Sequence, residues 1–204
     1  DTLFNHPNVG PFIGRQLIQR LVTSNPSPAY VRRVASAFNN NGQGVRGDMK
    51  AVIRAVLLDE EARGAHARKQ PSFGRIREPV LRFTHLMRAL EASSRTGYWG
   101  IGRTDVPGNL NQTAMRAPSV FNFYRPGYTP AGTPIAREKL VAPEMQILNE
   151  SSVAGYADYL NRFVGGTSIY IVGLGDMIPH PDGERHSGGQ AREIKFNLEP
   201  LIAK

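Results

Sequence analysis

Two histidines and two carboxylates stand within seven residues of one another towards the C-terminal end of the chain. The segment HPDGERH contains His180, Asp182, Glu184 and His186. Imidazole and carboxylate groups are ligands for divalent metals. Their spacing matches no standard site, and the proline and glycine between them provide no rigid frame. We therefore expect a solvated loop without a metal. If the chain does bind a metal here, these four residues are the candidate ligands.

Other titratable side chains could act as acids, bases or ligands. His6 precedes the first amphipathic segment, where a histidine commonly closes a turn, and His85 lies among apolar residues, which favours a hydrogen-bonded histidine at a helix interface. Both are catalytic candidates. The acidic run 59–61 would point in different directions on a helix. We expect this run to start a loop and to pair with Arg54 or Arg63.

The segment RAPSVFNFYRPGY, residues 116–128, interleaves arginines with aromatic rings. Such side chains can stack on bases, sugars or a protein partner. Prolines and a glycine fix the backbone here, and the two phenylalanines have no polar tip, so we interpret the segment mainly as packing. Candidate contacts to a ligand or partner are the cationic and amphipathic side chains in and near it: Trp99, Arg116, Tyr124, Arg125 and Tyr128.

Familiar catalytic and cofactor motifs are missing from the sequence. It contains no GxSxG, HExxH or GxxxxGK[ST]. The glycines of residues 97–102 lack the strand and helix that frame a dinucleotide loop. Zero cysteines exclude disulfides and thiol catalysis. We therefore expect no cofactor.

The net charge of +8 belongs to the first half of the chain. Residues 1–100 carry 15 Lys+Arg against 7 Asp+Glu, whereas residues 101–204 carry 10 of each. Basic residues on polar helix faces could follow nucleic-acid phosphates: Arg15, Arg20, Arg32, Arg33, Arg46 and Arg54. No recognised reading motif accompanies them, so nucleic acid is not the expected partner.

Apolar residues at helical spacing predict a mainly α fold. The predicted helices cover residues 11–22, 30–38, 49–57, 78–91, 149–163 and 192–204. Asp48 is the predicted cap of the third of these helices. This helix has the clearest apolar stripe, which consists of Met49, Val52, Ile53, Val56 and Leu57. Residues 64–75 are expected to be a linker.

We expect one helical, bundle-like domain over residues 1–204. It would comprise a basic helical part (1–94), a long packed loop rich in glycine, proline and aromatic residues (95–148), and a helix, short β-hairpin and helix (149–204). The hairpin is expected within 167–190. No apolar run approaches the ~18 residues of a membrane span.

Four blocks carry a family resemblance. They are residues 6–63, which begin HPNVGPFIGRQLIQRLV, and the segments REPVLRFTHLMRA (77–89), RAPSVFNFYRPGY (116–128) and LVAPEMQILNESSVAGYADYL (140–160). In this order they resemble the C-terminal half of a large bacterial family known as domain of unknown function 1800, whose members are much longer. The resemblance implies a mostly helical protein, exported to the periplasm or secreted, with genes beside those of a sulfatase-like family. It assigns no catalytic residue.

The expected function is accessory and not enzymatic. We expect an exported helical protein that binds a protein partner, with the sulfatase-like neighbour as the candidate, and that also contacts a missing N-terminal part of its own chain. One alternative is an enzyme acting on an envelope or extracellular polymer, which would need two histidines and a carboxylate to converge in a pocket. A second alternative is nucleic-acid binding through the basic first half.

Overall fold

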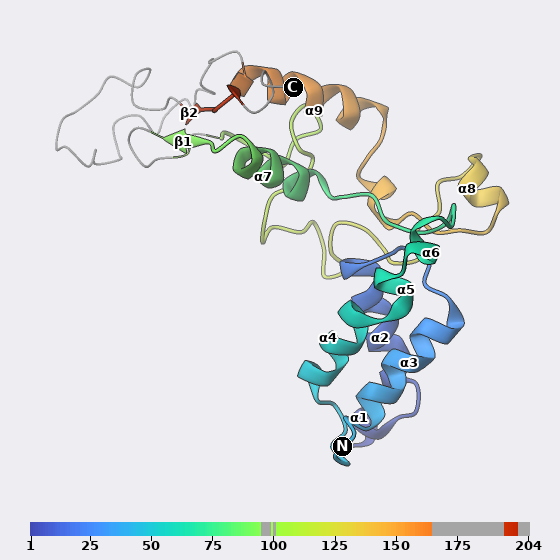
Figure 1. Ribbon diagram of the computed structural model, residues 1–204. Helices are drawn as coiled ribbons and strands as arrows, with labels where there is room; N and C mark the ends of the chain where they lie inside the picture. Colours follow the sequence, from blue (N-terminus) through green and yellow to red (C-terminus); the bar gives the residue numbers. More distant parts are fainter. Residues whose placement is uncertain (95–98, 100, 165–193, 200–204) are drawn as a thin grey trace. The chain divides into compact units, whose positions relative to one another are not determined.

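The computed structural model describes residues 1–94, 99, 101–164 and 194–199 (Figure 1). The chain divides into two compact units, Asp1–Ile76 with Tyr124–Gln146, and Arg77–Phe123 with Ile147–Lys204. Helices predominate in the described parts, and the strands there form one short pair. The mainly α fold is thus confirmed, while the grouping into one domain stays a prediction.

The first unit begins with a run of helices. They are α1 (Thr2–Asn5), α2 (Val9–Leu21), α3 (Pro28–Asn39), α4 (Met49–Leu58), α5 (Glu60–Arg63) and α6 (Ala65–Arg68). Helices α2 to α4 agree with three predicted helices to within two residues at either end. Two side chains cap them as their types favour: Ser27 accepts from the Tyr30 N–H, and Asp48 from the N–H groups of Lys50 and Ala51.

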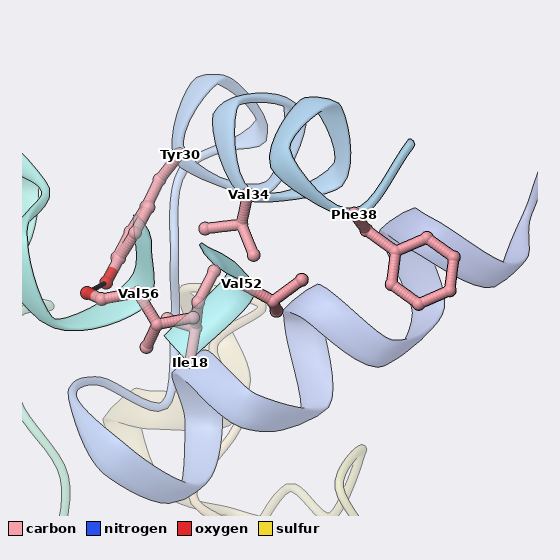
Figure 2. Close-up of a cluster of buried hydrophobic side chains, with 6 residues drawn as sticks. All are labelled: Ile18, Tyr30, Val34, Phe38, Val52 and Val56. Carbon is pink, nitrogen blue, oxygen red and sulfur yellow. Dashed lines mark hydrogen bonds between the residues drawn. The ribbon is translucent and has the colours of Figure 1, made fainter. Parts of the chain in front are cut away.

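An apolar core holds α2, α3 and α4 together. Figure 2 shows its six fully buried side chains meeting between the three helices: Ile18, Tyr30, Val34, Phe38, Val52 and Val56. Burying each such side chain contributes roughly 1.5–3 kcal/mol. The Tyr30 hydroxyl is satisfied as well, since it donates to the Val56 carbonyl at 2.5 Å.

Helices α2 and α3 approach closely because α2 has glycine at two successive turns of one face. A Cβ atom at Gly10 would lie 3.2 Å from the Ala35 carbonyl oxygen, and one at Gly14 would lie 3.0 Å from a methyl group of Val34. Larger side chains would therefore separate these helices and open the core.

The second segment of this unit, Tyr124–Gln146, contains α8 (Pro134–Arg137) and the 3₁₀ helix η1 (Pro143–Gln146). Polar contacts fasten it to the helical segment. The Asn25 side chain exchanges two hydrogen bonds with the backbone of Val141, at 3.0 and 2.9 Å. Arg75 donates to the buried carboxylate of Glu144 at 2.9 Å.

The second unit is built around α7 (Pro79–Ala89) and α9 (Glu150–Val164). Three rings form its centre, with centroids of Phe83, Tyr159 and Phe163 5.0–5.3 Å apart. The Tyr159 hydroxyl donates to the Ile101 carbonyl at 2.8 Å, which ties the segment after Trp99 to α9. These two helices agree with the predicted helices 78–91 and 149–163.

The predicted helix 192–204 is wrong at its start. Strand β2 (Ile194–Lys195) pairs antiparallel with β1 (Ser93–Ser94), Ser94 opposite Ile194. Ile194 is buried in the core of this unit, and Phe196 packs against the same core. Residues two positions apart share a face in an extended chain but not in a helix, so burial of both residues requires the extended form.

Within the parts of the chain that the structure describes, no helix is long and apolar enough to cross a membrane. The predicted hairpin at 167–190 lies outside the described residues.

Candidate functional site

The two most exposed large apolar side chains of the described structure, Met115 and Val120, lie on one loop of the second unit. In residues 114–121, here called the apolar loop, every residue is exposed, and Met115, Val120 and Phe121 have relative exposures of 101%, 96% and 69%. Its sequence AMRAPSVF contains a single charged group, Arg116. A structured loop that presents apolar side chains to water is typical of a protein interaction site.

Hydrogen-bonded turns shape this loop. The Arg116 N–H donates to the Thr113 carbonyl at 3.2 Å, and the Asn122 N–H donates to the Ser119 carbonyl at 3.1 Å. Met115 and Asn122 adopt left-handed φ angles of 62° and 71°. These turns direct the apolar side chains outward.

The base of the loop is held by Gln112, which is fully buried. Its Oε1 atom accepts from the Val80 N–H at 3.1 Å, and its Nε2 atom donates to Glu78 Oε2 at 2.5 Å. The next residue, Thr113, shares a 2.6 Å hydrogen bond with the hydroxyl of Thr104. The loop is therefore mounted on the first turn of α7 and on the segment after Ile101.

The predicted contact residues fall in two different units. Arg116 and Trp99 are exposed in the second unit. Tyr124 belongs to the first unit and is only 2% exposed, with the Arg20 guanidinium carbon 4.3 Å from its ring centroid. The packing interpretation of the aromatic segment thus holds for Tyr124, whereas the exposed Phe121 contradicts it.

Arg125 and Tyr128 follow Tyr124 in the first unit. Arg125 has an exposed side chain, and its backbone N–H donates to Gln146 Oε1 at 2.8 Å. Tyr128 is half-buried, and its carbonyl accepts from the Ala142 N–H at 2.9 Å. The backbones of these two residues hold the turn, while the Arg125 side chain is accessible to a partner.

The histidine candidates that the structure describes belong to different units. His6 is exposed at the end of α1 in the first unit, where its Nδ1 atom accepts from the Asn8 N–H at 3.2 Å, as expected of a turn-closing histidine. His85 is exposed on α7 in the second unit, so its predicted place in a helix interface is wrong. The inward stripe of α7 includes Phe83, and a residue two positions later points to the other side of the helix.

The metal candidates His180, Asp182, Glu184 and His186 lie outside the described residues. Among the residues that are described, no group of three or more histidine, aspartate or glutamate side chains could hold a metal ion.

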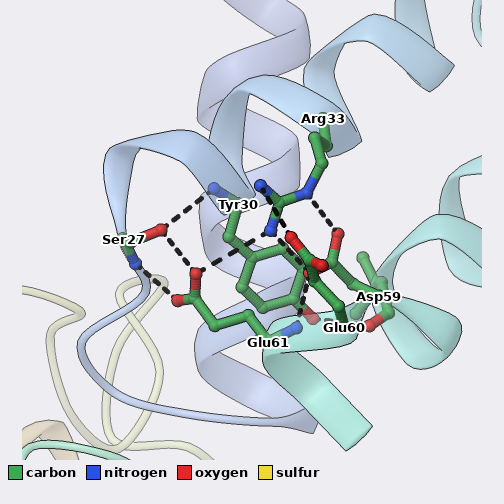
Figure 3. A network of polar contacts seen from close by, with 7 residues as sticks. Ser27, Tyr30, Arg33, Asp59, Glu60 and Glu61 are labelled. Carbon is green, nitrogen blue, oxygen red and sulfur yellow. Dashed lines mark hydrogen bonds and ion pairs between the residues drawn. The ribbon is translucent and has the colours of Figure 1, made fainter. Parts of the chain in front are cut away.

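The acidic run 59–61 belongs to a polar network between α3 and α5 (Figure 3). Arg33 binds Asp59 through two hydrogen bonds of 2.7 Å, and Asp59 also accepts from the Glu61 N–H at 2.9 Å, which begins α5. The Glu61 carboxylate in turn accepts from the backbone and hydroxyl of Ser27. The predicted loop start and the predicted partners of this run are therefore wrong, because Arg33 from a distant helix supplies the charge.

The electrostatics of this network indicate a structural role. Burial raises the pKa of Asp59, but hydrogen bonds from Arg33 and from the Glu61 N–H lower it more, so the pKa lies below its ordinary value. Burial, followed by the nearby carboxylates of Asp59 and Glu61, raises the pKa of the Tyr30 phenol. A general acid or base works best with a pKa near the working pH. Both shifts move the pKa away from neutral pH.

Several arginines of the basic first half make contacts inside the protein. Arg33 pairs with Asp59, and Arg20 lies over the Tyr124 ring. Arg46 donates to the carbonyls of Phe4 and His6 at 3.1 Å each, which fastens α1. Part of the positive charge of the first half therefore makes contacts within the protein.

Comparison with known proteins gives a family match. The model of a family described as "Protein of unknown function (DUF1800)" matches residues 1–184. No curated protein and no solved structure matches the chain. The match includes the apolar loop, the core of the first unit and helices α7 and α9 of the second, and it confirms the resemblance of the four sequence blocks. The chain therefore belongs to the DUF1800 family.

Proposed function

We propose that this chain is an accessory protein that binds a protein partner through the apolar loop, residues 114–121. The observation that carries this proposal is the almost complete exposure of Met115 and Val120 on a loop whose base is fixed by the buried Gln112. A pre-shaped loop loses little conformational entropy on binding, so more of the free energy from apolar contact is retained as affinity.

The composition of the loop defines the surface that it would fit. Burying Met115, Val120 and Phe121 would contribute roughly 1.5–3 kcal/mol each before the costs of association. Arg116 is exposed between them, and Asp105, a carboxylate on which the Arg116 charge acts, already binds Arg103. The partner surface is therefore an apolar pocket with an acidic group at its rim.

The sulfatase-like protein expected from the family resemblance is the proposed partner. Adjacent genes commonly encode proteins that act together, and an exported pair would meet in the periplasm or outside the cell. The exposure of the described candidates His6 and His85 and the internal contacts of Arg20, Arg33 and Arg46 favour this function over the enzymatic and nucleic-acid alternatives.

Affinity for the purified sulfatase-like neighbour, measured by calorimetry, tests the proposal. The double variant Val120→Ser/Phe121→Ser should bind about 100-fold more weakly, because two apolar side chains at ~1.5 kcal/mol each are lost from the interface. The matched control is Leu57→Ser/Leu58→Ser, which changes two exposed apolar residues of α4. Equal affinity of the loop variant and the unaltered chain would contradict the proposal, as would an equal loss in both variants.

A further inference from the structure

Arg82 of α7 has a guanidinium edge that is buried in the second unit. Its Cζ atom lies 4.4 Å from the centroid of the Tyr156 ring on α9, so the ring covers one face of the group. The Nε and Nη2 atoms are both shielded from solvent, and neither has a hydrogen-bond partner among the residues that the structure describes. Burying a cationic group in this way is unfavourable unless an acceptor is supplied.

The same two nitrogens bind carboxylates elsewhere in this chain. In Arg33 they donate to the two oxygens of Asp59 at 2.7 Å each. In Arg103 they donate to Asp105 at 3.1 and 2.8 Å. Nε–H and Nη2–H lie along one edge of the guanidinium plane and point in parallel, which matches the two oxygens of a carboxylate. Arg82 has the same pair of donors, and in this residue both are buried.

The residue placed to pair with Arg82 within the helix is held by another group. Glu78 lies four residues earlier, the spacing at which helical ion pairs form. Its Oε2 atom instead accepts from Gln112 Nε2 at 2.5 Å, and Gln112 is fixed at its other end by the Val80 N–H. Among the ion pairs of the described residues, none joins Glu78 to Arg82.

We propose that Arg82 is a binding residue for a small carboxylate ligand, which it holds side-on against the Tyr156 ring. Two parallel donors specify a planar group with two oxygens, and the shielded position of the donors favours a small anion over a bulky one. This site is separate from the apolar loop. Loss of partner binding and loss of carboxylate binding are therefore independent outcomes.

The 204-residue chain can be tested with acetate as the probe and chloride at equal ionic strength as the reference. Acetate should shift the ¹H–¹⁵N resonance of Arg82 Nε saturably, and chloride should not. At about five times its Kd, acetate should raise the Tm by roughly 2–4 °C in the unaltered chain. Arg82→Met, which keeps an apolar stem without the donors, should show no acetate-specific rise.

Two further variants keep the outcome interpretable. Arg88→Met changes an exposed arginine of the same helix and should retain the full acetate effect. Arg82→Lys keeps the charge without the paired donors and should lose most of the effect. This variant replaces Arg82→Met in the test if the methionine variant does not fold. The proposal is overturned if Arg82 Nε does not respond to acetate, if Arg82→Lys responds as the unaltered chain does, or if Glu78→Gln alone shifts the Nε resonance and abolishes further response.

Discussion

Among single residues, Asp59 links two helices through one carboxylate. It pairs with Arg33 of α3 and caps the first turn of α5. Asp59→Asn keeps the shape of the side chain and removes its charge, so the free energy of unfolding should fall by about 1–2 kcal/mol, measured by urea denaturation. The control Glu60→Gln alters a mostly exposed neighbour and should stay within about 0.5 kcal/mol. An equal loss in both variants would contradict this account.

The contribution of Asp59 to stability should depend on pH. Its folded pKa is depressed below the ordinary value of 3.8, so the unfolded chain binds the proton more tightly than the folded one. The stabilisation is therefore fully present above the ordinary pKa and is lost as the pH falls through the folded pKa. Urea denaturation at a series of pH values should show the difference from Asp59→Asn constant near neutrality and shrinking below about pH 4. A difference that grows towards low pH would contradict the assigned pKa direction.

Residue types alone could not separate exposed from buried aromatic side chains in the segment 116–128. Phe121 and Tyr124 are three positions apart, yet the first is exposed and the second is buried. Asn122, with its left-handed φ angle, turns the chain between them. Helical periodicity assigns faces only within a helix, so this loop had no pattern from which the site could be predicted.

At the scale of elements, Gly155 decides how closely α9 approaches the segment before Leu110. A Cβ atom here would clash with the Pro107 carbonyl oxygen and would lie 2.6 Å from Gly108 Cα. Gly155→Ala should therefore lower the free energy of unfolding of this unit by about 1–3 kcal/mol, despite the higher helix propensity of alanine. Thermal unfolding followed by near-ultraviolet circular dichroism would report on the ring cluster of Tyr159.

The exposed Asn161 provides the matched control on the same helix. Asn161→Ala should leave stability unchanged or raise it slightly, because alanine is the better helix former and no close contact is created. A Gly155→Ala variant as stable as Asn161→Ala would show that the backbone approach is not tight.

The main helices were predictable because apolar spacing and caps agree locally, as at Asp48 and Ser27. How deeply each side chain of an apolar helix face is buried could not be predicted. Val52 and Val56 are fully buried, whereas Met49 and Leu57 of the same predicted stripe remain 44% and 43% exposed. In so small a unit, two neighbouring helices cover only part of the stripe. Strand β2 was missed because its partner, β1, lies about a hundred residues earlier in the sequence.

At the scale of the whole molecule, the fold class and the family were predictable from the sequence, and the proposed binding loop was not. The four blocks of the resemblance all lie within the matched residues 1–184. The position of the site depends on which loop side chains remain exposed after folding, and composition does not contain that information. The charge balance likewise does not show which basic side chains make internal contacts, as Arg20, Arg33 and Arg46 do.

The most direct test of the central claim is amide hydrogen exchange of the chain with and without the purified sulfatase-like protein. The account predicts that exchange in residues 114–121 slows at least tenfold in the complex, while residues 53–58, which include the exposed Leu57 and Leu58, exchange as before. A complex that forms and leaves exchange in the apolar loop unchanged would contradict the assigned site. Absence of any complex at concentrations well above micromolar would contradict the assigned partner.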